Sequence, residues 1–92
     1  MNKEVFMSSI KVFVKDGCPR CPAAKCIAAA LREEGCNVCE FDMDTADGLA
    51  EAAFYGVMST PTMVVVDHEE NPVIWWRGGM PEPKEVISAM DA

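Results

Sequence analysis

The sequence has little positive charge and no hydrophobic run long enough to cross a membrane. Eight lysines and arginines stand against 15 aspartates and glutamates, so the formal net charge is −7, and such an acidic chain repels the phosphates of nucleic acids. We therefore expect no nucleic-acid partner and no membrane partner. The first residues also lack the apolar run and cleavage site of a signal peptide, so we expect a cytoplasmic protein. We also expect it to be a monomer.

The cysteines do not form the even set that a disulfide-paired secreted scaffold needs. There are five of them, and an odd number leaves at least one thiol unpaired. In a reducing compartment, neighbouring cysteines indicate catalysis or metal binding more often than structure. The 92 residues, half of them hydrophobic, suffice for one domain with a modest core. We expect residues 1–92 to be that domain, with residues 1–9 as a frayed lead-in.

Two of the thiols lie where a predicted strand gives way to a predicted helix. The apolar stretch 10–14 suits a buried strand, and residues 19–34 are mostly strong helix formers. Cys18 is therefore expected at the N-terminus of the helix and Cys21 on its inward stripe. Pro19 suits the first helical position, where a missing N–H costs nothing. A pair of cysteines in this place indicates either a redox site or a metal site.

The rest of the chain supplies three strands and two helices. We expect them in this order: a half-buried strand at 39–44, a short helix begun by Thr45-Ala46-Asp47 and ended by Gly56, a buried strand at 62–66, a strand at 73–77, and a helix from about Pro83. The expected inward residues are Cys39, Phe41 and Met43 of the first of these strands, and Leu49, Ala50, Ala53 and Phe54 of the short helix. The order β-α-β-α-β-β-α predicts an α/β fold, with a four-stranded mixed sheet and helices on both faces.

This order and the residues at its turns resemble the thioredoxin fold, and within it the short glutaredoxin-like members. Three segments carry the resemblance, which covers about residues 10–91: Cys18-Pro19-Arg20-Cys21 after the first strand, the segment 55–62 with its Thr60-Pro61 pair, and Gly78-Gly79 after the fourth strand. The resemblance implies that the bond between Thr60 and Pro61 is cis and lies beside the dithiol. It also implies that the backbone before Pro61 pairs with the substrate as an added strand.

The implied activity is that of a thiol–disulfide oxidoreductase. One thiolate attacks a substrate disulfide and a second thiol resolves the mixed disulfide. A helix N-terminus lowers the pKa of a cysteine from about 8.5 to about 3.5–7.5, so Cys18 is the expected nucleophile and Cys21 the resolver. The resemblance also implies a set of substrate-binding residues: Lys15, Pro19, Arg20, Thr60, Pro61, Gly78 and Gly79.

Other residues place the chain between two branches of that family. Glutaredoxins follow the double glycine with a Ser or Thr and an Asp that grip glutathione, whereas this chain has Met80-Pro81-Glu82. Thioredoxins have an aromatic residue before the nucleophile and a buried acid under the dithiol, whereas this chain has Gly17 and a first strand without an acid. We expect disulfide-containing proteins as substrates and no bound cofactor. Electrons would come from a flavin reductase or from glutathione, and the residues after Gly79 favour a protein reductase.

A metal site is the main alternative. Cys36 and Cys39 complete the spacing Cys-x2-Cys-x14-Cys-x2-Cys, which matches a four-thiolate zinc site. If residues 19–34 form one helix, however, its ends lie about 24 Å apart, too far for one ion to reach both pairs. A small soft-metal carrier also places Cys-x-x-Cys after its first strand, but orders its elements β-α-β-β-α-β. We assign no metal ligands and keep a carrier as the alternative, ahead of a redox-inactive interaction module.

Three further cysteines and two tryptophans have no assigned role. Cys36 and Cys39 are either a loop thiol and a core residue, or an auxiliary pair that forms a disulfide. Cys26 falls off the inward stripe of its helix, so we expect an exposed spare thiol. Trp75 and Trp76 point to opposite faces of their strand, so we expect one in the core and the other on a surface that contacts a partner.

Overall fold

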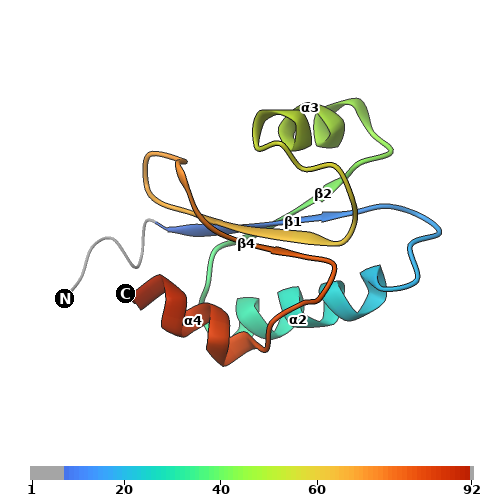
Figure 1. The fold of residues 1–92 in the computed structure, drawn as a ribbon. Helices are drawn as coiled ribbons and strands as arrows, with labels where there is room; N and C mark the ends of the chain where they lie inside the picture. Colours follow the sequence, from blue (N-terminus) through green and yellow to red (C-terminus); the bar gives the residue numbers. More distant parts are fainter. Residues whose placement is uncertain (1–7, 92) are drawn as a thin grey trace.

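A four-stranded mixed sheet lies between helices in the computed structural model, which describes residues 8–91 (Figure 1). The elements along the chain are β1 (Ser9–Val14), α2 (Cys21–Glu33), β2 (Val38–Asp42), α3 (Ala46–Phe54), β3 (Thr62–Val66), β4 (Pro72–Arg77) and α4 (Pro83–Asp91). This order confirms the predicted α/β fold. Of the expected lead-in, residues 1–7 lie outside the described part, Ser8 is buried and Ser9 already belongs to β1. None of the helices in residues 8–91 is long and apolar enough to span a membrane.

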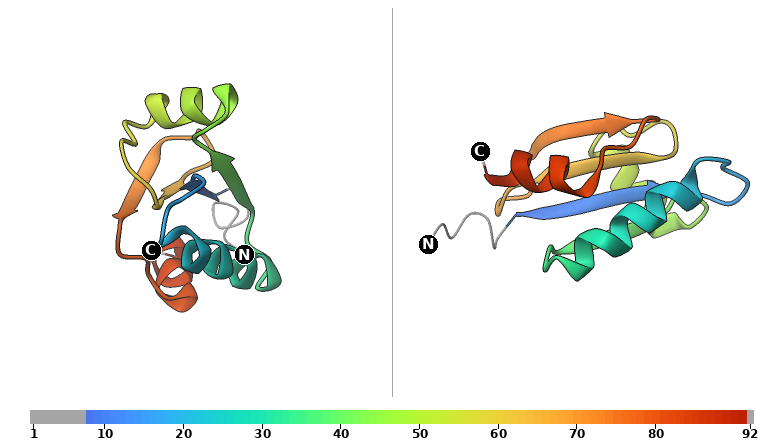
Figure 2. Two further views of the ribbon diagram at one scale, coloured as in Figure 1. Left: turned by 90° about the vertical axis from the view of Figure 1, so that its right-hand side faces the viewer. Right: turned by 90° about the horizontal axis from the view of Figure 1, so that it is seen from below.

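The strands are ordered β2-β1-β3-β4 across the sheet. β1 pairs parallel with β2 and antiparallel with β3, and β3 pairs antiparallel with β4. Figure 2 shows α2 and α4 on one face of the sheet and α3 on the other. Because β1 and β3 are central and covered on both faces, nearly all of their residues are buried. The edge strands β2 and β4 are mostly exposed or half-buried.

Two apolar clusters fill the layers on either side of the sheet. The cluster beside α2 and α4 takes alternate residues of β1, together with the inward faces of the helices: Ile10, Val12, Val14, Cys21, Ala24, Ala28, Leu31 and Val86 are among its members. The cluster beside α3 contains Phe13, Ala52, Tyr55, Val57, Val64 and Val66. The dithiol belongs to the first cluster, because Cys21 is part of that core.

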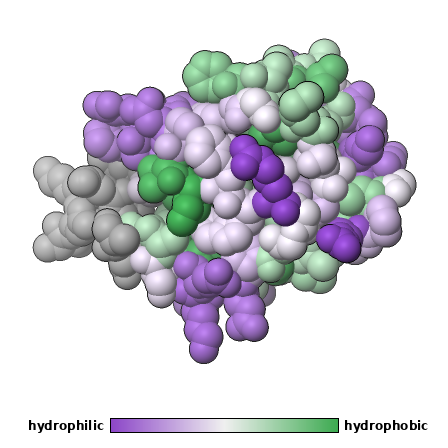
Figure 3. All heavy atoms as spheres, viewed as in Figure 1, coloured by the Kyte–Doolittle hydropathy of each residue, from purple (hydrophilic) through white to green (hydrophobic). Residues whose placement is uncertain are grey.

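The inward stripe predicted for α3 is wrong. All four residues expected on it are exposed: Leu49, Ala50, Ala53 and Phe54. The helix instead turns Gly48 and Ala52 toward the sheet. Gly48 packs so closely on the backbone of Asp42 that a Cβ there would overlap the Asp42 carbonyl. This close approach sets the rotation of α3, and Figure 3 shows the apolar residues that gather over the helix as a result.

The prediction for β2 is also partly wrong. The strand ends at Asp42 rather than at residue 44, and Cys39 is exposed instead of facing the core. Phe41 is half-buried and stacks on Phe13, with ring centroids 5.3 Å apart, and Met43 is half-buried beside the same cluster. β2 is an edge strand that meets α3 near Asp42, so the side chain of Cys39 at its other end stays uncovered.

Candidate active site

Cys18 lies in the connection between β1 and α2, Cys21 is the first residue of α2, and a disulfide joins them. Their Cα atoms are 5.4 Å apart, within the usual range for such a bond. Gly17, just before them, has a φ of +76°, a conformation that suits glycine. Cys18 is half-buried, whereas Cys21 is only 2% exposed and packs in the core. Cys18 therefore keeps some exposed surface, whereas Cys21 is covered.

The helix begins later than predicted. α2 starts at Cys21 with Arg20 as its N-cap, so Cys18 and Pro19 precede the helix instead of opening it. A helix opened by Pro19 would need an N–H at residue 22 to bond the carbonyl of Cys18, and Pro22 has none. The first α-helical bond runs instead from the Ala24 N–H to the Arg20 carbonyl, at 3.4 Å. Cys18 thus lies in the turn just before the positive end of α2.

A second segment of the site is the loop that enters β3. The peptide bond between Thr60 and Pro61 is cis, as the resemblance implies. Pro61 is buried, Thr60 is half-buried, and the Thr62 hydroxyl donates to the Ser59 carbonyl at 2.8 Å. The Gly78 N–H donates to the Pro61 carbonyl at 2.9 Å. This bond ties the loop to the connection between β4 and α4, where Gly78 has a φ of +79°.

The Arg20 side chain extends from the dithiol turn to the vicinity of that connection. Its Nη1 lies 3.9 Å from the position that a Cβ would take at Gly78. The structure therefore brings Arg20, Pro61 and Gly78 together from three segments far apart in the sequence. Lys15 and Pro19 are exposed in the same turn as Cys18, and Gly79 follows Gly78 at a position open to solvent. Their part in binding stays a prediction.

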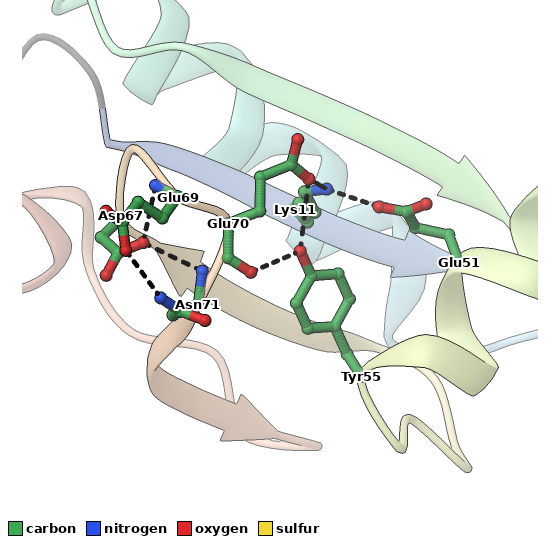
Figure 4. A network of polar contacts seen from close by, with 7 residues as sticks. All are labelled: Lys11, Glu51, Tyr55, Asp67, Glu69, Glu70 and Asn71. Carbon is green, nitrogen blue, oxygen red and sulfur yellow. Dashed lines mark hydrogen bonds and ion pairs between the residues drawn. The ribbon is translucent and has the colours of Figure 1, made fainter.

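Sequence reasoning missed a buried lysine in β1. Lys11 is 7% exposed, its ammonium forms ion pairs with Glu51 and with Glu70, the latter at 2.8 Å, and it lies 5.0 Å from the ring centroid of Tyr55 (Figure 4). The Tyr55 hydroxyl donates to the Glu70 carbonyl at 3.0 Å. Burial alone would lower the pKa of Lys11, but the hydrogen bonds to Glu51, Glu70 and Tyr55 outweigh it and raise the pKa above 10.5. The sequence feature that pointed to Lys11 was its place as the single charged residue within the apolar stretch 10–14.

The Lys11 network lies on the face of the sheet away from the dithiol. Lys11 neighbours Phe41 and Tyr55 under α3, whereas Cys21 belongs to the core beside α2. The network joins β1, α3 and the turn between β3 and β4, because Glu51 is in α3 and Glu70 is in that turn. It has a structural role, and no contact between it and Cys18 or Cys21 occurs in the described residues.

The remaining cysteines do not act as a second pair. Cys36 packs against the core beside α2, whereas Cys39 is exposed and follows Val38, which faces that core. Successive residues of a strand alternate between faces, so the two thiols point to opposite sides of the sheet, and the auxiliary disulfide considered from the sequence does not fit this fold. Burial and the charge of Glu34 raise the pKa of the Cys36 thiol. Cys26 is exposed, as predicted.

Neither the four-thiolate zinc site nor the soft-metal carrier considered from the sequence matches the fold. α2 spans 13 residues, about 20 Å, and separates the two cysteine pairs as expected. Within residues 8–91, no three His, Cys, Asp or Glu side chains are grouped to hold a metal ion. The observed order also has a helix between β2 and β3, which the order of a soft-metal carrier lacks.

Comparisons with known proteins agree with this architecture. The family described as a thioredoxin domain matches residues 8–91. A probable thioredoxin of Archaeoglobus fulgidus is 34% identical over 62 residues, which cover 66% of this chain and 68% of that protein.

Solved structures give the same fold. A mutant thioredoxin from Halobacterium salinarum superimposes with a TM-score of 0.78 at 22% identity, over 97% of this chain and 76% of that chain. Thioredoxin 1 from Thermosipho africanus has a TM-score of 0.72 at 19% identity and covers 90% of both chains. At these identities the structural matches concern the fold alone.

Proposed function

Because this chain belongs to the thioredoxin family, we propose that it reduces disulfides of other proteins through Cys18 and Cys21. The observation that carries the proposal is the unequal burial of the two sulfurs. Cys18 is half-buried before the positive end of α2, while Cys21 is 2% exposed. An accessible sulfur beside a helix N-terminus suits a nucleophile, and a covered one suits a resolving thiol.

The proposed reaction has two exchange steps. The Cys18 thiolate attacks one sulfur of the substrate disulfide, that S–S bond breaks, and the other substrate sulfur leaves as a thiolate that takes a proton from water. Cys21 then loses its proton and attacks the Cys18 sulfur. This step closes the Cys18–Cys21 disulfide and releases the second substrate thiol. Two electrons pass to the substrate, and an external dithiol or reductase restores the Cys18–Cys21 pair.

We assign substrate docking to the loop before β3 and its surroundings. The Thr60 backbone, next to the cis bond, would pair with the substrate chain as an added strand. The hydrogen bond from the Gly78 N–H to the Pro61 carbonyl supports this role, because it holds the loop to the connection between β4 and α4. The proposed binding residues are those that the resemblance implies: Lys15, Pro19, Arg20, Thr60, Pro61, Gly78 and Gly79.

We further propose that a flavin reductase, rather than glutathione, supplies the electrons. The support is the segment after Gly79, where Met80 packs against the core and Pro81 is buried. Pro81 has no N–H to donate to a glutathione carboxylate. The oxidised protein should be reduced rapidly by a flavin thioredoxin reductase with NADPH, and much more slowly by millimolar glutathione. Equal rates with glutathione would overturn this choice of donor.

Dithiothreitol-driven reduction of insulin tests the dithiol itself. We expect Cys18→Ser to abolish the reaction and Cys21→Ser to reduce it strongly. Cys26→Ser is the matched control, since Cys26 is an exposed thiol on the same helix, and it should leave the rate unchanged. Activity that survives Cys18→Ser would overturn the mechanism, and stoichiometric zinc or copper in the purified protein would favour a metal carrier instead.

A further inference from the structure

Arg20 is an exposed cation without an ion-pair partner among residues 8–91. The lysines and arginines that form ion pairs there are Lys11 and Arg32, and four others besides Arg20 form none: Lys15, Lys25, Arg77 and Lys84. Arg20 stands between the two catalytic cysteines in the sequence, and at the N-cap position of α2 its side chain makes no capping hydrogen bond. In a chain with 15 acidic residues and a net charge of −7, acidic side chains outnumber the cations that pair with them. Arg20 is the unpaired cation that stands between the two thiols, so its donors are free to bind a group that approaches the dithiol.

The guanidinium lies at the edge proposed for substrate docking. Its Nη1 is 3.9 Å from the Cβ position of Gly78, and the Gly78 N–H holds the Pro61 carbonyl at 2.9 Å. A Cβ at position 78 would be in ordinary van der Waals contact with the guanidinium, so the two groups lie side by side. A substrate chain paired along Thr60 would thus carry the neighbours of its cysteine past Arg20. Guanidinium groups bind carboxylates through two parallel hydrogen bonds.

We propose that Arg20 selects substrates in which an acidic residue flanks the attacked cysteine. The inference rests on the proposed disulfide reduction and names its substrate class. The net charge of −7 repels acidic peptides at long range. A preference for an acidic neighbour must therefore come from a local contact. Arg20 has unpaired donors beside Gly78, whereas the guanidinium of Arg77 lies over the Trp75 ring.

Two synthetic peptides test the proposal. Each carries one intramolecular disulfide, and they differ only in a Glu or a Lys next to the attacked cysteine. At low ionic strength we expect the wild-type protein to reduce the Glu peptide with a kcat/KM about tenfold higher than the Lys peptide, the size of one charge-assisted hydrogen bond. The ratio should fall to about one or below in Arg20→Gln and should invert in Arg20→Glu.

The matched control is Arg32→Gln. Arg32 lies twelve residues further along α2, about 18 Å away, and its loss changes the net charge by the same amount. The ratio should stay near the wild-type value in this variant. A ratio that is close to one in the wild-type protein, or that is unchanged in Arg20→Gln, would overturn the proposal.

An uncharged reference substrate separates this inference from the proposed function. Reduction of bis(2-hydroxyethyl) disulfide reports the reactivity of the dithiol without any carboxylate. If Arg20 only tunes Cys18, both peptides and the reference slow together in Arg20→Gln, and the selectivity proposal fails while the reductase stands. If the wild-type protein reduces none of the three substrates, the proposed function itself is wrong.

Discussion

Replacing Lys11 by methionine tests how much the buried ion pairs contribute to stability. The Lys11 side chain is 9% exposed, and that of Glu51 is 29% exposed. Removing one partner of a buried pair costs about 3–5 kcal/mol. Because Glu51 can regain water, we expect the loss for Lys11→Met to be about 2–3 kcal/mol, and methionine keeps the apolar stem that packs against Tyr55. In a domain of this size the melting temperature should fall by roughly 10–20 °C.

Urea unfolding followed by the fluorescence of the two tryptophans measures this loss directly. Wild type and variant are compared in the reduced state, so that the Cys18–Cys21 disulfide does not contribute to the difference. Lys25→Met is the control, because Lys25 is exposed on α2 and the same chemical change should cost less than about 0.5 kcal/mol. A Lys11→Met variant as stable as wild type would refute the reasoning, since the ion pairs would then not outweigh the cost of burying their charges.

Three more predictions concern pH, helix rotation and a buried thiol. The hydrogen bond from Lys11 lowers the pKa of Glu70 below 4.5, and the pKa of Lys11 itself is raised above 10.5. The difference in unfolding free energy between wild type and Lys11→Met should therefore be constant at neutral pH. It should shrink as the pH falls below about 4.5 or rises above about 10.5. A gap that grows in acid would contradict these signs. Phe54 is 76% exposed and Ala52 is fully buried. In urea unfolding, Phe54→Ala should therefore cost under about 1 kcal/mol and Ala52→Leu about 1–3 kcal/mol. A larger cost for Phe54→Ala than for Ala52→Leu would support the inward stripe expected from the sequence. With its raised pKa, Cys36 should alkylate at higher pH than the two exposed free thiols, as mass spectrometry can show.

Local patterns were enough to predict the element order and the dithiol. β3 occupies residues 62–66 as predicted, because a run of five mostly apolar residues after Pro61 has few alternatives. Cys18 and Cys21 were found because their spacing and their place between a strand and a helix are both local features. The late start of α2 was also readable in principle, since Pro22 lacks the N–H that an earlier helix needs.

Features set by distant contacts could not be predicted in the same way. The rotation of α3 depends on how closely Gly48 approaches Asp42, and its apolar residues alone favoured the opposite face. The exposure of Cys39 follows from the edge position of β2, which alternation within the strand does not reveal. Lys11 finds its partners 40 and 59 residues away. Each of these features depends on which segments meet in space rather than on sequence neighbours.

Trapping of the mixed disulfide tests the assignment of Cys18 as the nucleophile most directly. In Cys21→Ser the resolving thiol is absent, so a disulfide-containing protein substrate should remain covalently attached to the variant. Peptide mapping by mass spectrometry should place that bond on Cys18, and dithiothreitol should release it. An adduct formed through Cys26, Cys36 or Cys39 in its place, or an equal yield of adduct from Cys18→Ser, would contradict the account.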